Sequence, residues 1–385
     1  MQDTEDELLL DPFQRFLEEQ CSLAALRKAA RLPAKGAGKS RAAVFETADP
    51  TADPAGDDSD AVPVNLPTDS AIAPTDREVY SQLWTQLCEQ GWPLLLVPES
   101  QDGIGLSMTQ ATRVMELAGM ALLPLPLGYW INTVAFLNQA DANAEVTQRV
   151  QTLLSEGQLA GFALESSLGH SFVPYSLNGA PLLKLSYSEG KLRAQWHTGT
   201  GVVPGDGIDP MIDSAWLVDQ TNQEKTVLSC SPEEWNGYES RGRLLIAAEL
   251  LGGAARALQL ATAYAQERQQ FGRSVGGFQG IKHRLAQDWM NLDNARLLIA
   301  EAAAVAGEDS ALSLVLAETV TQQAADTVVR NALQVHGAMG MTWECDVHFY
   351  LKRVHFLNAM LNRERSAADR LQQIWQLSEA RMAQY

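Results

Sequence analysis

An arginine and three glutamines in the last third of the chain are suited to hold a phosphate-rich ligand. Arg268 carries a permanently charged, planar fork of N–H donors that matches a pyrophosphate. Gln270, Gln279 and Gln334 each offer an amide that can donate hydrogen bonds to phosphate or adenosine. Gly337 has no Cβ and lets the backbone approach a nucleotide closely. Taken singly, each residue also has a structural reading, in which Arg268 caps or ion-pairs within a bundle and the glutamines lie on solvated faces.

These residues belong to a region whose spacing indicates helices. From residue 243 to 385 the chain is rich in alanine and leucine, and apolar residues recur every three or four positions. The pattern predicts four helices, over residues 251–265, 281–295, 311–335 and 350–376. Long helices with short connections predict an antiparallel bundle. Inside the first helix, Gly252 and Gly253 each cost about 1 kcal/mol relative to alanine. A close approach by another helix or by a bound ligand would explain them.

The first third of the chain is also predicted to be helical. Helical spacing runs over residues 5–31, with a break expected at Pro12, and again over residues 77–91. Ser107 and Gln110 form a capping-box pair that opens a further helix.

The middle third has a different pattern. Between residues 127 and 241, short apolar runs are separated by turn residues such as Asn178-Gly179 and Glu189-Gly190. This predicts a small antiparallel β domain with a few helical stretches. We therefore expect a mainly α fold with a central antiparallel β domain. Its three units are residues 1–126, 127–241 and 242–385.

Composition excludes several classes of function. The chain has 29 Lys+Arg against 47 Asp+Glu, a formal net charge of −18. Phosphate backbones and anionic lipids repel such a chain, so neither nucleic acid nor a membrane is an expected partner. No apolar run approaches the roughly 18 residues of a membrane span. The first residues are acidic where a signal peptide is basic. Four scattered cysteines indicate reduced thiols, no metal site and a cytoplasmic protein.

Residues 33–76 differ in character from the rest. They are rich in Ala, Asp, Pro, Ser and Gly, with five aspartates between positions 49 and 60 and no apolar period. We expect a disordered or loosely packed insertion. A solvated linker is favoured over an acidic interaction arm.

Three separated motifs resemble those of the acyl-CoA dehydrogenases. Residues 267–286 (ERQQFGRSVGGFQGIKHRLA) resemble the family's ERxQFG…FQxIxHxLA signature. Residues 334–344 (QVHGAMGMTWE) resemble its QxxGGxGY(T)xE segment, and residues 91–107 (GWPLLLVPESQDGIGLS) its GW…VPEEYGGLGLS element. The motifs occur in the family's order and spacing. Together they span most of the chain outside residues 33–76.

The resemblance implies an acyl-CoA dehydrogenase fold and a role in the α,β-dehydrogenation of an acyl-CoA thioester. It also implies contacts to FAD across a subunit interface, reaching a flavin seated mainly in the neighbouring chain. Electrons would pass to an electron-transfer flavoprotein. The positions that match the family's FAD-contacting motifs are Arg268, Gln270, Phe271, Gln279, Gln334, Gly337 and Ala338.

The glutamate that removes the α-proton in this family is missing from both of its usual positions. One position lies nine residues after an arginine, and counting from Arg353 reaches Asn362, whose amide has no useful basicity. The other immediately precedes an arginine that looks like Arg243, and here that position is Gly242.

Two nearby carboxylates are possible substitutes for the missing base. Glu249 lies two helical turns beyond Gly242, roughly 10 Å along the axis. Glu364 comes two residues after Asn362. For both we favour the commoner fate of a helical glutamate, which is a solvated face.

The β region departs from the family as well. Where the family has T-E-P-x-x-G-S against the flavin ring, residues 164–170 read LESSLGH. Motifs that act on a partner's FAD are thus kept, and motifs that act on the chain's own flavin and substrate are degraded. This pattern predicts the base-lacking subunit of a heteromeric, α2β2-type dehydrogenase, as in steroid breakdown, sharing FAD with a homologous catalytic subunit. Two rivals remain: an active homo-oligomer using Glu249 or Glu364, and a non-catalytic scaffold.

Overall fold

The structure is a computed structural model that describes eleven stretches of the chain. They are residues 2–30, 32, 77–139, 144–165, 170–176, 179–197, 201–205, 207–218, 223–305, 310–363 and 367–382. The predicted insertion at 33–76 lies outside the described residues, and so does Glu364.

The N-terminal part is helical, as predicted. Its elements are α1 (Gln2–Gln20), α2 (Leu23–Ala29), α3 (Arg77–Glu89), η1 (Trp92–Leu94), η2 (Glu99–Gln101), α4 (Met108–Met120), α5 (Leu127–Gln139) and α6 (Ala144–Ser155). The break expected at Pro12 is wrong, because α1 runs through it and the chain breaks after Gln20 instead. The capping box at Ser107 and Gln110 is confirmed, since each side chain bonds the other's backbone N–H.

Two small sheets follow. The strands are β1 (Gly161–Phe162), β2 (Ser171–Val173), β3 (Leu182–Ser188), β4 (Lys191–His197), β5 (Val202–Gly205), β6 (Ser214–Leu217) and β7 (Gln223–Leu228). One sheet has the order β1-β3-β4-β7 and the other β2-β6-β5. The pairings among these described strands are antiparallel except for β1 with β3, which is parallel. The β region is therefore not purely antiparallel.

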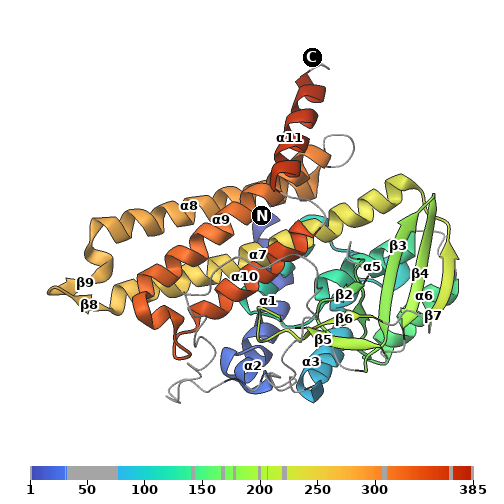
Figure 1. Ribbon diagram of the computed structural model, residues 1–385, viewed down its shortest axis with the longest axis horizontal. Helices are drawn as coiled ribbons and strands as arrows, with labels where there is room; N and C mark the ends of the chain where they lie inside the picture. Colours follow the sequence, from blue (N-terminus) through green and yellow to red (C-terminus); the bar gives the residue numbers. More distant parts are fainter. Residues whose placement is uncertain are drawn as a thin grey trace, which may run out of the picture.

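Helices make up the remainder of the chain. They are α7 (Pro232–Glu267), α8 (Gln279–Ala304), α9 (Ser310–His336), α10 (Val347–Asn362) and α11 (Ala367–Met382), with the short segments β8 (Gln269–Gln270), β9 (Arg273–Ser274), η3 (Val275–Gly277) and η4 (Gly337–Met341). A capping box between Ser231 and Glu234 starts α7, so the boundary expected at 241/242 falls inside this helix. The single helix expected over 350–376 is wrong. It is two helices, and α11 projects away from the bundle (Figure 1).

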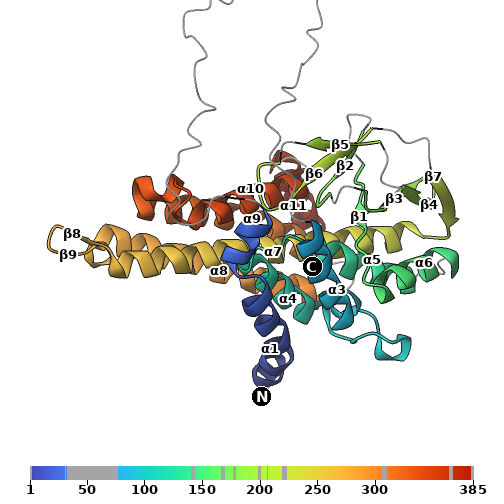
Figure 2. The same ribbon diagram turned by 90° about the horizontal axis from the view of Figure 1, so that it is seen from below.

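The long helix α7 is the centre of the molecule. It contacts α4 on one side and α9 and α10 on the other (Figure 2). The α4 contact is made through backbone, because a Cβ on Gly252 would lie 1.9 Å from the Glu116 carbonyl oxygen. A Cβ on Gly119 would likewise lie 1.9 Å from the carbonyl oxygen of Glu249. A close helix–helix approach thus accounts for Gly252.

Burial also explains the apolar character of α7. Among the described residues it is the one helix long and apolar enough to cross a membrane by length and composition alone. However, 78% of its most apolar stretch is buried inside the protein, as in the core helix of a globular domain.

Candidate functional site

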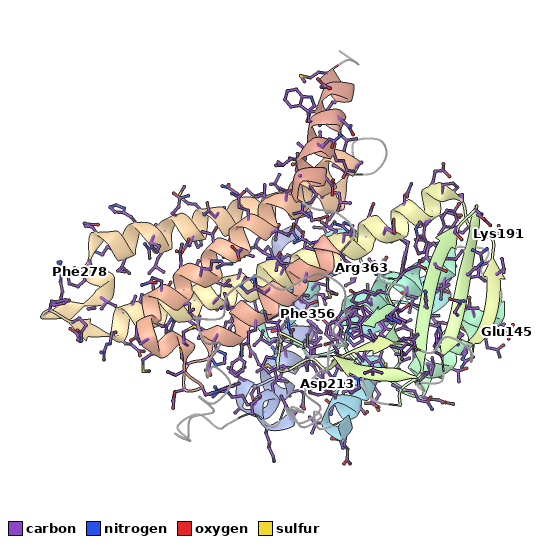
Figure 3. The ribbon with its side chains drawn as sticks, in the orientation of Figure 1. Glu145, Lys191, Asp213, Phe278, Phe356 and Arg363 are labelled. Atoms are coloured by element: carbon purple, nitrogen blue, oxygen red, sulfur yellow. The ribbon has the colours of Figure 1, made fainter. Side chains whose placement is uncertain are left out.

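All seven residues expected to contact FAD lie exposed at one end of the bundle. We call this region the nucleotide end; it comprises the C-terminus of α7, the β8–β9 hairpin, the start of α8 and the junction of α9 with η4. The exposed residues are Arg268, Gln270, Phe271, Gln279, Gln334, Gly337 and Ala338. Figure 3 marks this end by Phe278. Motifs 60 to 70 residues apart in the sequence lie together here, because α8 begins at this end of the bundle and α9 ends at it.

Aromatic stacking holds the nucleotide end in shape. The ring of Tyr264 on α7 stacks on His336 at the end of α9, with centroids 4.5 Å apart. At the hairpin, the Arg273 guanidinium lies 3.9 Å from the centroid of the Phe278 ring. The turn itself places Phe271 at a φ of +52° with its side chain 91% exposed. An exposed aromatic on a strained turn is typical of a group presented to a ligand or to another chain.

The residues at this end fit the phosphate-rich half of a dinucleotide. Within the described part of the chain, the guanidinium of Arg268 makes no hydrogen bond or ion pair, so its donors remain available. Gly337 has a φ of +63°, which glycine adopts readily, and a Cβ there would meet nothing within 4 Å. Space and donors for an anionic ligand are therefore present at the surface.

A separate cavity of about 220 Å³ lies where α5, α7 and α10 meet the β3 side of the larger sheet. Arg363, one of its lining residues, lies well away from Phe278 in the same chain (Figure 3). Five aromatic residues are part of its lining, and we therefore call it the aromatic cavity: Tyr129, Phe162, Tyr187, Trp235 and Tyr238. Within one chain, the cavity and the nucleotide end are far apart in space. One ligand can therefore contact both kinds of region only where the cavity of one chain lies against the nucleotide end of another.

Neither expected position of the catalytic base offers a carboxylate to this cavity. Gly242 lines it, but a Cβ there would lie 2.9 Å from the Asn132 amide nitrogen. That nitrogen donates to the Tyr238 carbonyl at 2.8 Å, so Asn132 is anchored in the place of a side chain at 242. The amide oxygen of Asn362 accepts from Gln322 at 3.1 Å and from Arg370 at 2.6 Å. Asn362 thus has a structural role in the described chain.

Two charged residues line the cavity beside Gly242. Arg243 is held by Glu318, with the Arg243 Nε 2.8 Å from Glu318 Oε2, and it also donates to the Leu361 carbonyl. Glu239 brings a carboxylate into the lining, one helical turn before Gly242 on α7. Sequence reasoning missed Glu239 because it considered only the family's two positions and two carboxylates that follow them, Glu249 and Glu364. The spacing of three residues on one helix was the signal that could have found it.

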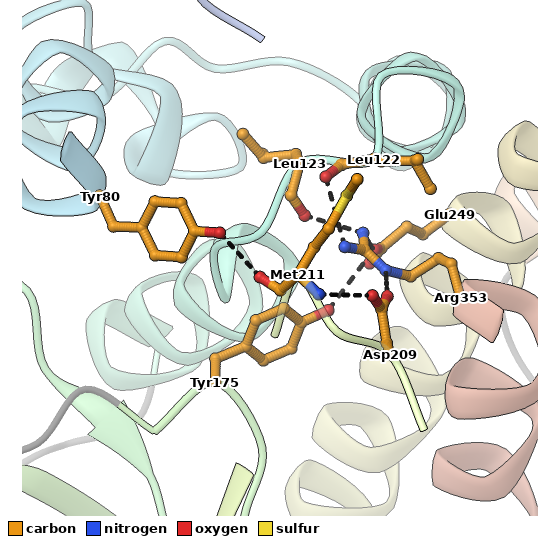
Figure 4. Close-up of polar contacts among 8 residues, drawn as sticks. All are labelled: Tyr80, Leu122, Leu123, Tyr175, Asp209, Met211, Glu249 and Arg353. Carbon is orange, nitrogen blue, oxygen red and sulfur yellow. Dashed lines mark hydrogen bonds and ion pairs between the residues drawn. The ribbon is translucent and has the colours of Figure 1, made fainter. Parts of the chain in front are cut away.

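Glu249 does not lie on a solvated face, and that expectation is wrong. It is 5% exposed and belongs to a buried cluster with Tyr175, Asp209 and Arg353 (Figure 4). Arg353 Nε lies 2.5 Å from Asp209 Oδ2, and Arg353 Nη1 lies 3.4 Å from Glu249 Oε1. The Tyr175 hydroxyl donates to the same Glu249 oxygen at 3.4 Å. The carboxylate of Glu249 is not among the groups that line the cavity.

Charges in this cluster do not balance. Arg353 is fully buried and faces two carboxylates, and its remaining donors reach the carbonyls of Leu122 and Leu123. Asp209 also accepts from the Met211 N–H, so it is the better satisfied of the two acids. Burial, offset only in part by Arg353, raises the pKa of Glu249 to about 7. Burial and then the charge of Glu249 raise the pKa of Tyr175 well above its usual value.

Comparison with known proteins agrees with this architecture. Residues 66–157 match the N-terminal domain model of the acyl-CoA dehydrogenases, and residues 240–360 match the C-terminal domain model. The chain is 32% identical over 310 residues to the acyl-CoA dehydrogenase IpdE2 of Mycobacterium tuberculosis, covering 80% of this chain and 91% of that protein.

Two solved structures share the fold along nearly the whole chain. One is the Tcur3481-Tcur3483 steroid ACAD (TM-score 0.70, 18% identity, 100% of both chains). The other is the ChsE4-ChsE5 complex of Mycobacterium tuberculosis (TM-score 0.69, 18% identity, 97% of this chain and 96% of that chain). These two structures share the fold, and the two family models and the relative establish that the chain belongs to the acyl-CoA dehydrogenase family.

Proposed function

We propose that this chain is one subunit of a heteromeric, FAD-dependent acyl-CoA dehydrogenase and that it lacks the catalytic base. The observation that carries the proposal is the state of the two base positions. Asn132 fills the space beside Gly242, and Asn362 is tied to Gln322 and Arg370. A proton acceptor for the acyl α-carbon then comes from a homologous partner subunit.

The nucleotide end supplies this subunit's contribution to the shared site. Arg268 binds the pyrophosphate of FAD, and Gln270, Gln279 and Gln334 hydrogen-bond the adenosine half. The backbone at Gly337 and Ala338 approaches the same half, and Phe271 packs against it. Bound FAD supplies hydride acceptance at the acyl β-carbon. The residues of this chain hold and orient the cofactor, whose ring lies in the partner.

The substrate is a bulky CoA thioester, such as one from steroid breakdown, and the electrons pass to an electron-transfer flavoprotein. Support comes from the relatives, since one structural neighbour is a steroid ACAD and another is a two-component complex. We propose that the complex is cytoplasmic and that each pair of unlike subunits shares one FAD.

The proposal is tested by purifying tagged protein from its native host. We expect about one flavin per two chains, with a homologous second polypeptide identified by mass spectrometry. Arg268→Ala should lower the flavin content of the complex. Arg15→Ala is the charge-matched control, because Arg15 is a surface residue of α1 paired with Asp11. Unchanged flavin in the Arg268 variant would instead favour a scaffold subunit that does not touch FAD.

A second candidate function is favoured by Glu239. A carboxylate in the aromatic cavity is where an active homo-oligomer would need its base. This candidate predicts one flavin per chain, turnover without a partner, and loss of turnover in Glu239→Gln. If a homogeneous preparation of the Glu239→Gln variant binds flavin and has the same turnover as the wild type, Glu239 is not the catalytic base. The same substitution at Glu249 and Glu364 tests the other two carboxylates.

A further inference from the structure

The buried cluster of Tyr175, Asp209, Glu249 and Arg353 lies directly behind the wall of the aromatic cavity. The ring of Tyr175 meets that of Tyr129, a cavity-lining residue, edge to face with centroids 6.4 Å apart. Tyr175 also meets Phe356 of α10 at 5.7 Å and 90°. Tyr129 in turn stacks on Phe162, which lines the same cavity, at 5.5 Å. A continuous path of packed rings therefore joins the cluster to the cavity.

Two of the five non-glycine residues that have a positive φ in the described part of the chain lie at the same place. Tyr175 has a φ of +55° and Leu122, whose carbonyl accepts from Arg353, has a φ of +54°. Neither residue is glycine, and such conformations are unfavourable unless the surroundings hold them. The hydrogen bond from the Tyr175 hydroxyl to Glu249 and the contact of Arg353 with Leu122 are the interactions that hold them (Figure 4).

Glu249 is the loosely held member of the cluster. Its two contacts are 3.4 Å long, whereas Asp209 is 2.5 Å from Arg353 and also accepts a backbone N–H at 2.9 Å. The guanidinium of Arg353 lies closer to Asp209 than to Glu249, so it compensates the charge of Glu249 only in part, in a buried site. A second carboxylate in that situation readily takes a proton.

The surroundings of Glu249 contain few other charges that could control it. α10 presents Arg353, the β5–β6 connection presents Asp209, and the segment after β2 presents Tyr175. On α4, Gly119 packs closely against the backbone carbonyl of Glu249. The carboxylate of Glu116, also on α4, is occupied by the guanidinium of Arg296.

We propose that Glu249 is a proton-linked positioning residue, whose charge state sets how firmly Tyr175 holds Tyr129 in the wall of the cavity. Ionised Glu249 accepts the Tyr175 hydroxyl hydrogen bond and attracts Arg353, which fixes the strained turn at Tyr175. Protonated Glu249 loses the attraction to Arg353 and weakens the hold on Tyr175. The wall at Tyr129 is then less restrained. This inference goes beyond the proposed function, because it needs neither FAD, acyl-CoA nor a partner subunit.

The test places a fluorine reporter on the cavity wall. Tyr129 is replaced by 3-fluorotyrosine in the full-length protein, and the fluorine resonance is followed by NMR across the neutral pH range. We expect the resonance to move with a midpoint near pH 7, where the pKa of Glu249 lies. Glu249→Gln should abolish this titration while the resonance remains. A wild-type resonance that does not titrate, or a titration that survives in Glu249→Gln, overturns the proposal.

Two further variants separate positioning from general damage. Tyr175→Phe keeps the ring and removes the hydroxyl, so the resonance of residue 129 should lose most of its pH response. This variant also serves if Glu249→Gln fails to fold, and an undiminished response in it contradicts the coupling. Glu116→Gln removes a buried, ion-paired carboxylate from the other side of the α4–α7 contact. We expect it to leave the midpoint unchanged, and a shifted midpoint would mean that any buried acid in the core has the same effect.

Discussion

Two arginines of the same helical bundle have opposite surroundings. Arg268, at the nucleotide end, is exposed and has no ion partner among the described residues. Arg353, in the buried cluster, has no exposed surface and faces Asp209 and Glu249. The first has donors to offer a ligand, whereas each of the three guanidinium nitrogens of the second bonds to a group of the fold. An arginine's availability, rather than its charge, therefore separates binding from structure in this protein.

The same contrast holds for the backbone of the two regions. Positive φ angles at Phe271, Gly272 and Gly337 shape an open surface turn. Positive φ angles at Leu122 and Tyr175 are enclosed by packed rings and charges. Strain at the surface presents groups outward, whereas strain in the core has to be held by a specific contact.

Removing the buried arginine should have the largest effect on stability. Arg353→Met leaves Asp209 and Glu249 buried without a cation, and we expect a loss of about 3–5 kcal/mol in the free energy of unfolding. Urea denaturation followed by circular dichroism measures it. A loss below about 1 kcal/mol would mean that the cluster is not buried as described.

The second prediction concerns the pH dependence of stability. The pKa of Glu249 is raised in the folded protein, from 4.5 to about 7, so the folded state holds a proton that the unfolded state releases. The stabilisation of the folded state by this bound proton is complete below pH 4.5 and is lost as the pH rises through about 7. Relative to wild type, Glu249→Gln should therefore gain about 3 kcal/mol of unfolding free energy over that interval.

Unfolding curves at several pH values for both proteins measure this difference. Comparing the pair cancels the titration of every other group. A constant difference between the two proteins across the interval would show that Glu249 is ionised throughout.

The third prediction tests the backbone contact of α4 with α7. Gly252→Ala places a Cβ 1.9 Å from the carbonyl oxygen of Glu116, so we expect destabilisation by about 1–3 kcal/mol despite alanine's better helix propensity. Gly280→Ala in α8 is the matched control, because a Cβ there meets nothing within 4 Å. It should be neutral or stabilising by up to about 1 kcal/mol. Thermal melts of the two variants should move in opposite directions from wild type.

The smallest effect on stability is expected at the exposed arginine. Arg268→Ala removes no internal contact, so the free energy of unfolding should change by less than about 0.5 kcal/mol. Flavin retention should nevertheless fall. A large loss of stability in this variant, measured on the chain alone, would assign Arg268 to the fold and would remove the contrast with Arg353.

Local signals predicted the helical bundle well. Helical spacing located most helices because burying one face of a helix demands that spacing. The capping box at Ser107 was readable because its two residues contact each other. The motif positions from Arg268 to Ala338 were chosen by resemblance. The structure places them together on an exposed end, although their contact with FAD stays a prediction.

Three other features were not predicted, although the sequence carries a local signal for two of them. The capping box at Ser231 was present in the sequence but was overlooked, so the start of α7 was set too late. The helix expected over 350–376 divides at Asn362, where the chain changes direction against α9. Glu239 was missed because the candidates considered were the family's positions and carboxylates C-terminal to them, whereas Glu239 lies one turn earlier on the same helix.

The sequence by itself determined which elements form and which residue types the family motifs contain, since both depend on neighbours a few positions away. Only the tertiary structure decided that Glu249 is buried, that Gly252 allows the close approach of α4, and that Asn132 fills the space beside Gly242. Arg353 meets Asp209 across 144 residues of chain. The role of a charged side chain depends on the groups that folding places next to it. Such partners carry no periodic signal, so the same residue type is exposed and available to a ligand at position 268 and is a structural contact at position 353.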